Sequence, residues 1–212
     1  MLMPYELLQF SRLLQYAYLK IKLPGRGIIV HQTVKQWLSL GTWLVLLGLL
    51  SACDGNTELM KQAMSGDPVA VRLSLEKGAD VNEKNNYGWT ALMHTAKQNK
   101  TATMAVLLDA GANINHQDND GWTALMRSAA KGNIEATQLL LNRDANVNLT
   151  EKNGWTALLW AVNRQHKDVV KALIEKGADV NIKAKDGRSA IAIARNEEFI
   201  EILEILKQAG AK

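Results

Sequence analysis

Apolar and polar positions between residues 121 and 153 alternate in blocks that predict two short helices followed by a loop. The run Ala124–Ala130 keeps apolar side chains at helical spacing, and Thr123 before it supplies a hydroxyl that can cap the first amides. A Gly-Asn pair interrupts the run, and Ile134–Leu141 again places apolar residues along one side of a helix. The polar residues that follow predict a turn and then an exposed, hairpin-like loop.

The same pattern recurs at a constant interval along the chain. Gly-Trp-Thr-Ala-Leu begins at Gly88, Gly121 and Gly154, and weaker versions begin at Gly187 and Gly55. A fixed period between about 20 and 50 residues is typical of stacked-repeat architectures, in which each unit packs on its neighbours. We therefore expect an all-α solenoid of about five helix-turn-helix-loop repeats. The repeats are expected over residues 55–87, 88–120, 121–153, 154–186 and 187–212.

These motifs resemble those of the ankyrin repeat family. Besides Gly-x-Thr-x-Leu, the chain carries Gly-Ala-Asp-Val-Asn at Gly78–Asn82 and Gly177–Asn181, and Gly-Ala-Asn-Ile-Asn at Gly111–Asn115. We expect the first glycine of each to follow a second helix in the left-handed conformation, with Asp144 in the equivalent place of another repeat. The family's Thr-Pro-Leu-His becomes Thr-Ala-Leu-Met or Thr-Ala-Leu-Leu. The family's Thr–His hydrogen bond is therefore absent, and methionine or leucine packing takes its place.

An uncharged, apolar stretch of sixteen residues, Trp37–Ala52, precedes the repeats. It is short for a membrane span but suits the apolar region of a signal peptide, and Lys35 stands just before it. Leu50-Ser51-Ala52-Cys53 resembles the lipobox of bacterial lipoproteins. That resemblance implies a signal peptide over 34–53, cleavage after Ala52, a lipid on the Cys53 sulfur, and acylation of the new amino terminus with a fatty acid such as palmitate. The alternative is a single-pass signal anchor.

Residues 1–33 carry no readable function. We expect them to be a short cytoplasmic tail, or an upstream extension that is not part of the protein if translation starts at Val34. Either reading of the apolar stretch sends the repeats across the membrane, because all the basic residues of this segment precede it. Asp54 after the cysteine resembles the signal that retains lipoproteins in the inner membrane. We therefore expect a lipid-anchored protein of the bacterial cell envelope that faces the periplasm, at the inner rather than the outer membrane.

The formal net charge of +4 comes from the N-terminal segment. Residues 1–53 hold five basic residues and one acidic residue, so the rest of the chain has a net charge of zero. A repeat region without excess positive charge argues against nucleic-acid binding. The single cysteine excludes an intramolecular disulfide framework and a cysteine-based zinc site.

The residue after each opening glycine is a candidate for partner binding. In the ankyrin family this position lies on the concave face, which usually binds another protein. Here it is a tryptophan in three successive repeats, and stacking of the repeats is expected to align the three indoles in a ladder. Trp and Arg are enriched among interface hot spots, although each indole could instead brace its own loop. The candidate partner-binding residues are Trp89, Trp122, Trp155, Arg188, Tyr87, Asp120 and Asn153.

Catalytic and metal-binding readings find little support. His94, His116 and His166 occupy different phases of the repeat, so stacking does not bring them together. No serine lies in a nucleophile-elbow motif, and we expect neither catalysis nor a cofactor nor a metal. We expect His94 to be a packing or solvated residue.

The expected function is non-catalytic protein binding by a membrane-anchored, monomeric ankyrin-repeat lipoprotein. It binds or protects a protein of the envelope, whose identity the sequence does not give. One alternative is an inhibitor or immunity protein against a secreted or membrane-acting enzyme. The other is a structural spacer.

Overall fold

The computed structural model describes residues 54–212, which form ten α-helices and no strand. The expected signal segment 34–53, with the lipobox cysteine Cys53, and the residues 1–33 before it lie outside the described part. The helices are α3 (Glu58–Ser65), α4 (Pro68–Glu76), α5 (Ala91–Lys97), α6 (Thr101–Asp109), α7 (Ala124–Lys131), α8 (Ile134–Asn142), α9 (Ala157–Asn163), α10 (Lys167–Glu175), α11 (Ala190–Asn196) and α12 (Ile200–Gln208). The only β-type pairing in this part is one isolated antiparallel bridge, between Lys183 and Ser189.

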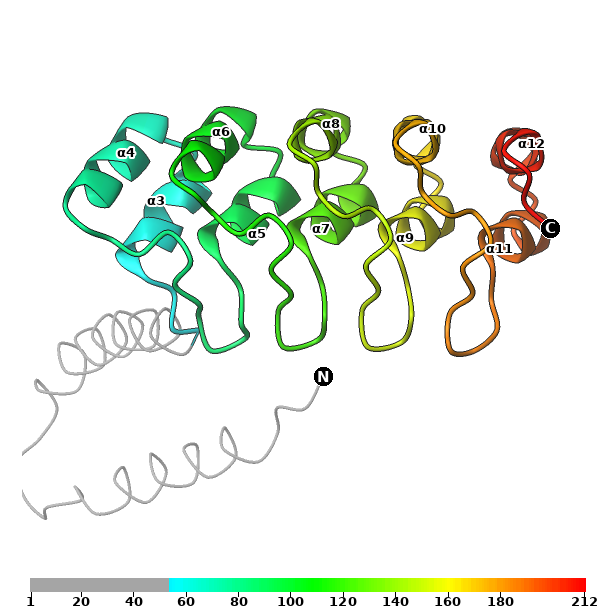
Figure 1. Ribbon diagram of the computed structural model, residues 1–212, viewed down its shortest axis with the longest axis horizontal. Coiled ribbons are helices and arrows are strands. Elements are labelled where there is room, and N and C mark those ends of the chain that lie inside the picture. The colour runs from blue at the N-terminus through cyan, green and yellow to red at the C-terminus, as the bar shows by residue number, and fades with distance from the viewer. Residues whose placement is uncertain (1–53) are drawn as a thin grey trace, which may run out of the picture. The chain divides into compact units, whose positions relative to one another are not determined.

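The helices form five antiparallel pairs that stand in a row (Figure 1). The first helices of the pairs, α3, α5, α7, α9 and α11, pack side by side in one layer, and the second helices form a layer over them. Long loops join each pair to the next and project on the other side of the first-helix layer (Figure 1). The all-α solenoid expected from the period is confirmed, and the helices in the repeat used for the prediction extend one residue beyond each predicted end, to Lys131 and Asn142.

The first helices begin where the sequence supplies a hydroxyl. Thr57, Thr123, Thr156 and Ser189 each accept a hydrogen bond from the amide three residues later, which satisfies one of the free amides of the first turn. Thr90 occupies the same position without making this bond. The second helix of the first pair begins differently, with Asp67 accepting from two amides and a proline following it.

Besides the glycine that opens each loop, two turn positions of each repeat are left-handed, one after each helix. The glycines expected in this conformation after the second helices have it, and Asp144 adopts it as well, with φ of 61°. Between the two helices of a pair the position is filled by glycine in two repeats. The other three repeats place Asn99, Gln165 and Glu198 there, each with φ of 58°. The fold therefore imposes this conformation even where the residue disfavours it.

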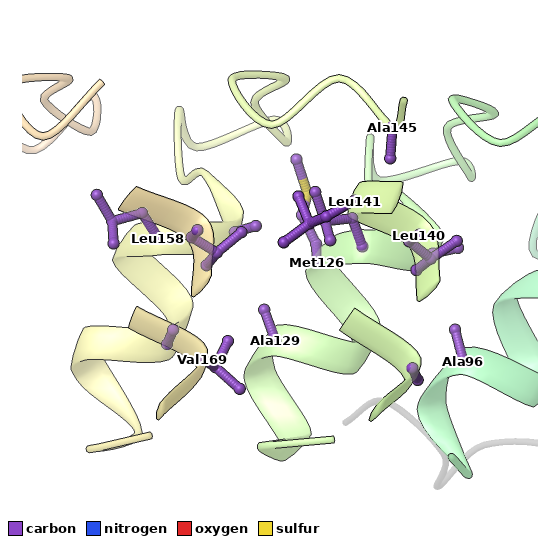
Figure 2. Packing of buried hydrophobic residues seen from close by; sticks show 14 of the residues in the cluster. Ala96, Met126, Ala129, Leu140, Leu141, Ala145, Leu158 and Val169 are labelled. Carbon is purple, nitrogen blue, oxygen red and sulfur yellow. The ribbon is translucent and has the colours of Figure 1, made fainter. Parts of the chain in front are cut away.

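The core repeats with the same period. Leu59, Leu92, Leu125, Leu158 and Ile191 occupy one position of the first helices and are all buried. Their neighbours Met93, Met126 and Leu159 are also buried, as expected for the residues that replace the family's histidine. Figure 2 shows Met126, Leu140 and Leu141 closing the space between one repeat and the next. Because each buried leucine or methionine contributes about 2 kcal/mol, this continuous core is what holds the pairs together.

None of the helices between residues 54 and 212 has the length and apolar character needed to span a bilayer.

Candidate functional site

The loops before α5, α7 and α9 are each folded around a buried polar side chain, whereas the loop before α11 has the buried Ala184 at the same position. Asn85 accepts hydrogen bonds through Oδ1 from the amides of Tyr87 and Trp89, and Asp118 repeats this arrangement with Asp120 and Trp122. Glu151 accepts from the amide of Trp155 in the next loop. These bonds tie the tryptophan of each loop to the polar residue four positions earlier, so the loop has a defined shape.

Successive loops are joined to one another by a ladder of backbone hydrogen bonds. The amides of Asn86, Asn119, Lys152 and Lys185 donate to the carbonyl groups of Asp54, Tyr87, Asp120 and Asn153, respectively, at 2.8 to 3.1 Å. The other three acceptors, Tyr87, Asp120 and Asn153, are the candidate residues at the loop tips. Their backbone therefore links neighbouring repeats and leaves the side chains for other contacts.

The candidate side chains at the loop tips are exposed. Tyr87 is 58% exposed, and Asp120, Asn153 and Arg188 are exposed too. Asp120 faces the ammonium group of Lys152 at 3.4 Å, and Arg188 pairs with Asp186. These contacts lie in solvent, where an ion pair contributes at most about 1 kcal/mol.

The three predicted indoles are not stacked on one another. Trp155 is buried, with 5% of its surface exposed, and Trp89 and Trp122 are half-buried. The guanidinium of Arg127 lies between two of them, 4.1 Å from the ring centre of Trp89 and 4.2 Å from that of Trp122. The expected ladder is therefore interrupted by a side chain from the first helix of the middle repeat.

The next gap is filled by a fourth indole. The ring of Trp160 on α9 lies 4.5 Å from Trp122 and 4.7 Å from Trp155, and the guanidinium of Arg188 lies 4.7 Å from Trp155 on the far side. At the other end Trp89 contacts the ring of His94 at 4.9 Å. We call this series the aromatic–cation column. It consists of His94, Trp89, Arg127, Trp122, Trp160, Trp155 and Arg188.

Arg127 is also the ionic partner of the buried Asp118. Its guanidinium donates to the Asp118 carboxylate at 2.5 Å, and the two side chains are 17% and 1% exposed. Burial of a carboxylate is costly unless it is paired and hydrogen-bonded, and Asp118 has both a cationic partner and hydrogen bonds. One arginine therefore supports the loop through Asp118 and the two neighbouring indoles through its flat face.

His94 is a packing residue at neutral pH. Its burial, with the nearby positive charges of Lys97 and Arg127, lowers its pKa from 6.5 to about 4, against a smaller opposing effect of Asp54. The imidazole is therefore uncharged as it packs on Trp89.

Sequence reasoning did not find Arg127 and Trp160 as members of the column, and it did not place His94 beside Trp89. These are three members of the column. They occupy one and the same position of the first helix in consecutive repeats. The sequence contains a signal for this arrangement. One repeat position holds large flat side chains and another holds tryptophan, which indicates that the two sets of side chains interleave.

The remaining histidines lie apart from the column. His116 is 2.9 Å through Nε2 from the carbonyl oxygen of Gly88, and the ring of His166 lies against Gly132. No group of three His, Cys, Asp or Glu side chains suited to a metal ion occurs within residues 54–212.

A comparison with protein families finds a match to the model described as Ankyrin repeats (3 copies). The model matches residues 59–151 and, in a second match that overlaps the first, residues 128–212. The two matches together span well over half of the chain. A comparison with curated proteins finds no match.

Proposed function

This chain belongs to the ankyrin repeat family, and from that premise we propose that it is a lipid-anchored protein that binds another protein at the bacterial cell envelope. Ankyrin repeats indicate a protein–protein interaction module and are generally non-catalytic. The proposal adds the place, the anchor and the residues that contact the partner.

The observation that carries the proposal is the row of exposed side chains on a hydrogen-bonded set of loops. Tyr87, Asp120 and Asn153 lie at equivalent places of successive loops, and their carbonyl groups form the ladder that joins those loops. A surface held in one shape before binding loses little conformational entropy when a partner docks. An exposed tyrosine beside polar groups of both signs is typical of a protein interface.

The column supports this surface from below. We propose that Trp89, Trp122 and Trp155 act mainly as braces, because each is packed between flat side chains of its own and the next repeat. The partner then contacts the exposed loop tips, Arg188 and the accessible edges of the half-buried indoles. This assigns the indoles both of the roles that the sequence left open, with bracing as the larger one.

The proposed anchor rests on the sequence before the repeats. The apolar stretch Trp37–Ala52 and the lipobox-like residues that end at Cys53 support processing as a lipoprotein. Only residues 54–57 separate Cys53 from the start of α3. Two or more acyl chains on Cys53 give stable attachment, so the repeats are held near the bilayer, on the periplasmic side of the inner membrane.

Binding near a membrane suits two related roles. The first is protection or stabilisation of an envelope protein, which we favour. The second is inhibition of a secreted or membrane-acting enzyme, for which the short tether is the motivating feature. A spacer without a specific partner is the remaining alternative.

The test is cross-linking and affinity capture from membranes with matched variants. The loop-tip variant carries Tyr87→Ser, Asp120→Ala and Asn153→Ala, and its control carries Gln138→Ala and Lys171→Ala on the exposed side of α8 and α10. We expect the loop-tip variant to lose the partner and the control to keep it, with both retaining the wild-type circular dichroism. Equal capture by both variants, or no specific partner for the wild type, contradicts the proposal.

The anchor is tested separately with Cys53→Ala. Metabolic labelling with a palmitate analogue should mark the wild-type protein and leave Cys53→Ala unmarked, and the variant should keep an unprocessed signal segment. A Cys53→Ala protein that is still processed and acylated shows that the lipobox assignment is wrong.

A further inference from the structure

An open cavity of about 540 Å³ lies on the loop face between the fourth and fifth helix pairs. Its walls come from the loop before α9, from α9 itself and from the loop before α11. It is lined by Asn153, Trp155, Trp160, Lys185, Asp186 and Arg188. Two of these residues are the indoles at the end of the column, so the cavity combines aromatic surface with polar groups from two loops.

The charges in the cavity are unequal. Arg188 and Asp186 neutralise each other, because the guanidinium donates to the carboxylate at 2.7 Å through Nε and a second nitrogen lies 2.6 Å away. Lys185 forms no ion pair with any residue from 54 to 212. The cavity therefore carries one uncompensated positive charge.

The preceding repeat shows what is different about Lys185. Lys152 stands at the equivalent position one repeat earlier, and its ammonium group faces the carboxylate of Asp120, while its amide donates to the carbonyl of that same residue. Lys185 makes the same backbone bond, to Asn153, but Asn153 has no carboxylate. The geometry that pairs a lysine with an acid in one repeat is thus kept in the next without the acid.

A second polar group in the lining has no partner. The indole Nε1–H of Trp160 is buried and finds no acceptor among the described residues. A buried donor without an acceptor is costly, and buried donors are normally satisfied. Because this group is itself buried, a ligand in the cavity meets the ring of Trp160 and not its N–H, whose NMR signal reports on changes beside the ring.

We propose that this cavity binds a carboxylate side chain from an acidic segment of the partner protein. The carboxylate oxygens accept from the Lys185 ammonium, and the methylene groups of the acidic residue lie on the indole rings of Trp155 and Trp160. This inference rests on the proposed function, because it names the chemistry of the partner at one part of the same face. The adjacent Arg188–Asp186 ion pair adds no net charge to the cavity, so the site suits one or a few carboxylates of the partner.

The experiment uses the full chain, labelled with ¹⁵N-tryptophan, and two blocked peptides, acetyl-hexaglutamate amide and acetyl-hexaglutamine amide. The indole N–H signal of Trp160 is identified by its absence in Trp160→Phe. We expect hexaglutamate to move this signal in a saturable way that weakens with added salt, and hexaglutamine to leave it in place. No movement with hexaglutamate, or equal movement with hexaglutamine, overturns the proposal.

Lys185→Gln and Lys152→Gln form a matched pair, since both lysines are exposed and lie at the same repeat position. Lys185→Gln should weaken hexaglutamate binding about fivefold, whereas Lys152→Gln should not change it. An equal loss in both variants overturns the proposal, because it indicates non-specific attraction to the surface. Movement of the Trp160 signal by phosphatidylglycerol vesicles, but not by hexaglutamate, also overturns it and points to a lipid.

The outcomes separate this inference from the proposed function. Partner capture that depends on the loop tips, with no hexaglutamate binding at Trp160, removes the inference and leaves the proposed function standing. Hexaglutamate binding at Trp160 without any partner captured from membranes keeps the acidic site and removes the proposed envelope partner.

Discussion

Arg127 is the residue on which the loop face depends most. It contacts Trp89, Trp122 and the buried carboxylate of Asp118 at the same time. In the preceding repeat the same two positions hold His94 and Asn85, a pair without charge. One repeat period later an ionic pair thus replaces the neutral one, and a flat side chain still lies against the tryptophan of its own repeat, Arg127 against Trp122 as His94 lies against Trp89.

Removing the guanidinium alone should be strongly destabilising. Arg127→Leu leaves Asp118 buried without its cation and removes two cation–π contacts, so we expect a loss of about 3 kcal/mol in the free energy of unfolding. Urea denaturation followed by far-UV circular dichroism measures this loss.

A second substitution separates the charge from the packing. Asp118→Asn keeps an Oδ1 that can accept the amides of Asp120 and Trp122, as Asn85 does in its own loop. The double variant Arg127→Leu/Asp118→Asn should therefore recover more than half of the loss. A double variant whose loss in stability equals the sum of the losses in the two single variants contradicts this account, because residues that form one ion pair are coupled.

The loop is the element that joins one repeat to the next, and its glycine is placed against the following loop. Gly154 has φ of 80°, and a Cβ there would lie 3.1 Å from the backbone nitrogen of Lys185. Gly187 occupies the same place one repeat later, with φ of 81° and nothing within 4 Å of its Cβ position. The two glycines differ in the presence of a following loop and not in backbone conformation.

This difference allows strain and close approach to be measured apart. Gly187→Ala should cost about 1 kcal/mol, which is the penalty for an alanine in the left-handed region. Gly154→Ala should cost at least about 1 kcal/mol more, because the lysine amide must move and its bond to Asn153 weakens. Thermal and urea unfolding of the two variants, side by side, measure the difference. Equal losses in the two variants would show that the following loop moves away from the new Cβ at no cost in stability.

Across the whole row of repeats, a second ladder runs along the turns after the second helices. The Oδ1 atoms of Asn82, Asn115, Asn148 and Asn181 accept from the amides of Asn113, Asn146, Asp179 and Lys212, at 2.7 to 3.0 Å. Each asparagine thus holds the turn of the next repeat. The repeats are coupled by these bonds and by the core between neighbouring helices.

The position of an asparagine in the ladder should determine its effect on cooperativity. Asn115→Ala breaks a bond between two interior repeats, so we expect a loss of about 1 kcal/mol and faster amide exchange on both sides of the break. Asn181→Ala frees only the amide of Lys212, beyond α12, and should have a smaller effect confined to that end. Hydrogen exchange measured by mass spectrometry tests this, and exchange that rises equally in both variants contradicts it.

Much of the solenoid could be read from the sequence because its structure is local. The constant repeat period, the hydroxyl before each first helix and the left-handed turns each depend on residues close together in the chain. The candidate loop tips were also found from their phase in the repeat, since Tyr87, Asp120 and Asn153 hold equivalent places and are all exposed. Whether they bind a partner is a separate question that the proposed capture experiment addresses.

The packing of side chains inside the loop face could not be predicted from the sequence, because it depends on contacts between repeats. Trp122 and Trp160 are adjacent in space although they belong to different repeats, and Arg127 lies against Trp89 of the previous repeat. The sequence by itself determined that each repeat forms two helices and a loop, because helix periodicity, capping and turn conformation are short-range effects. Only the tertiary structure decided that the tryptophans interleave with an arginine and a fourth indole, and that Lys185 lacks the acid that Lys152 has. Those features depend on how closely one repeat is stacked on the next and at what register, which packing between neighbouring helices sets.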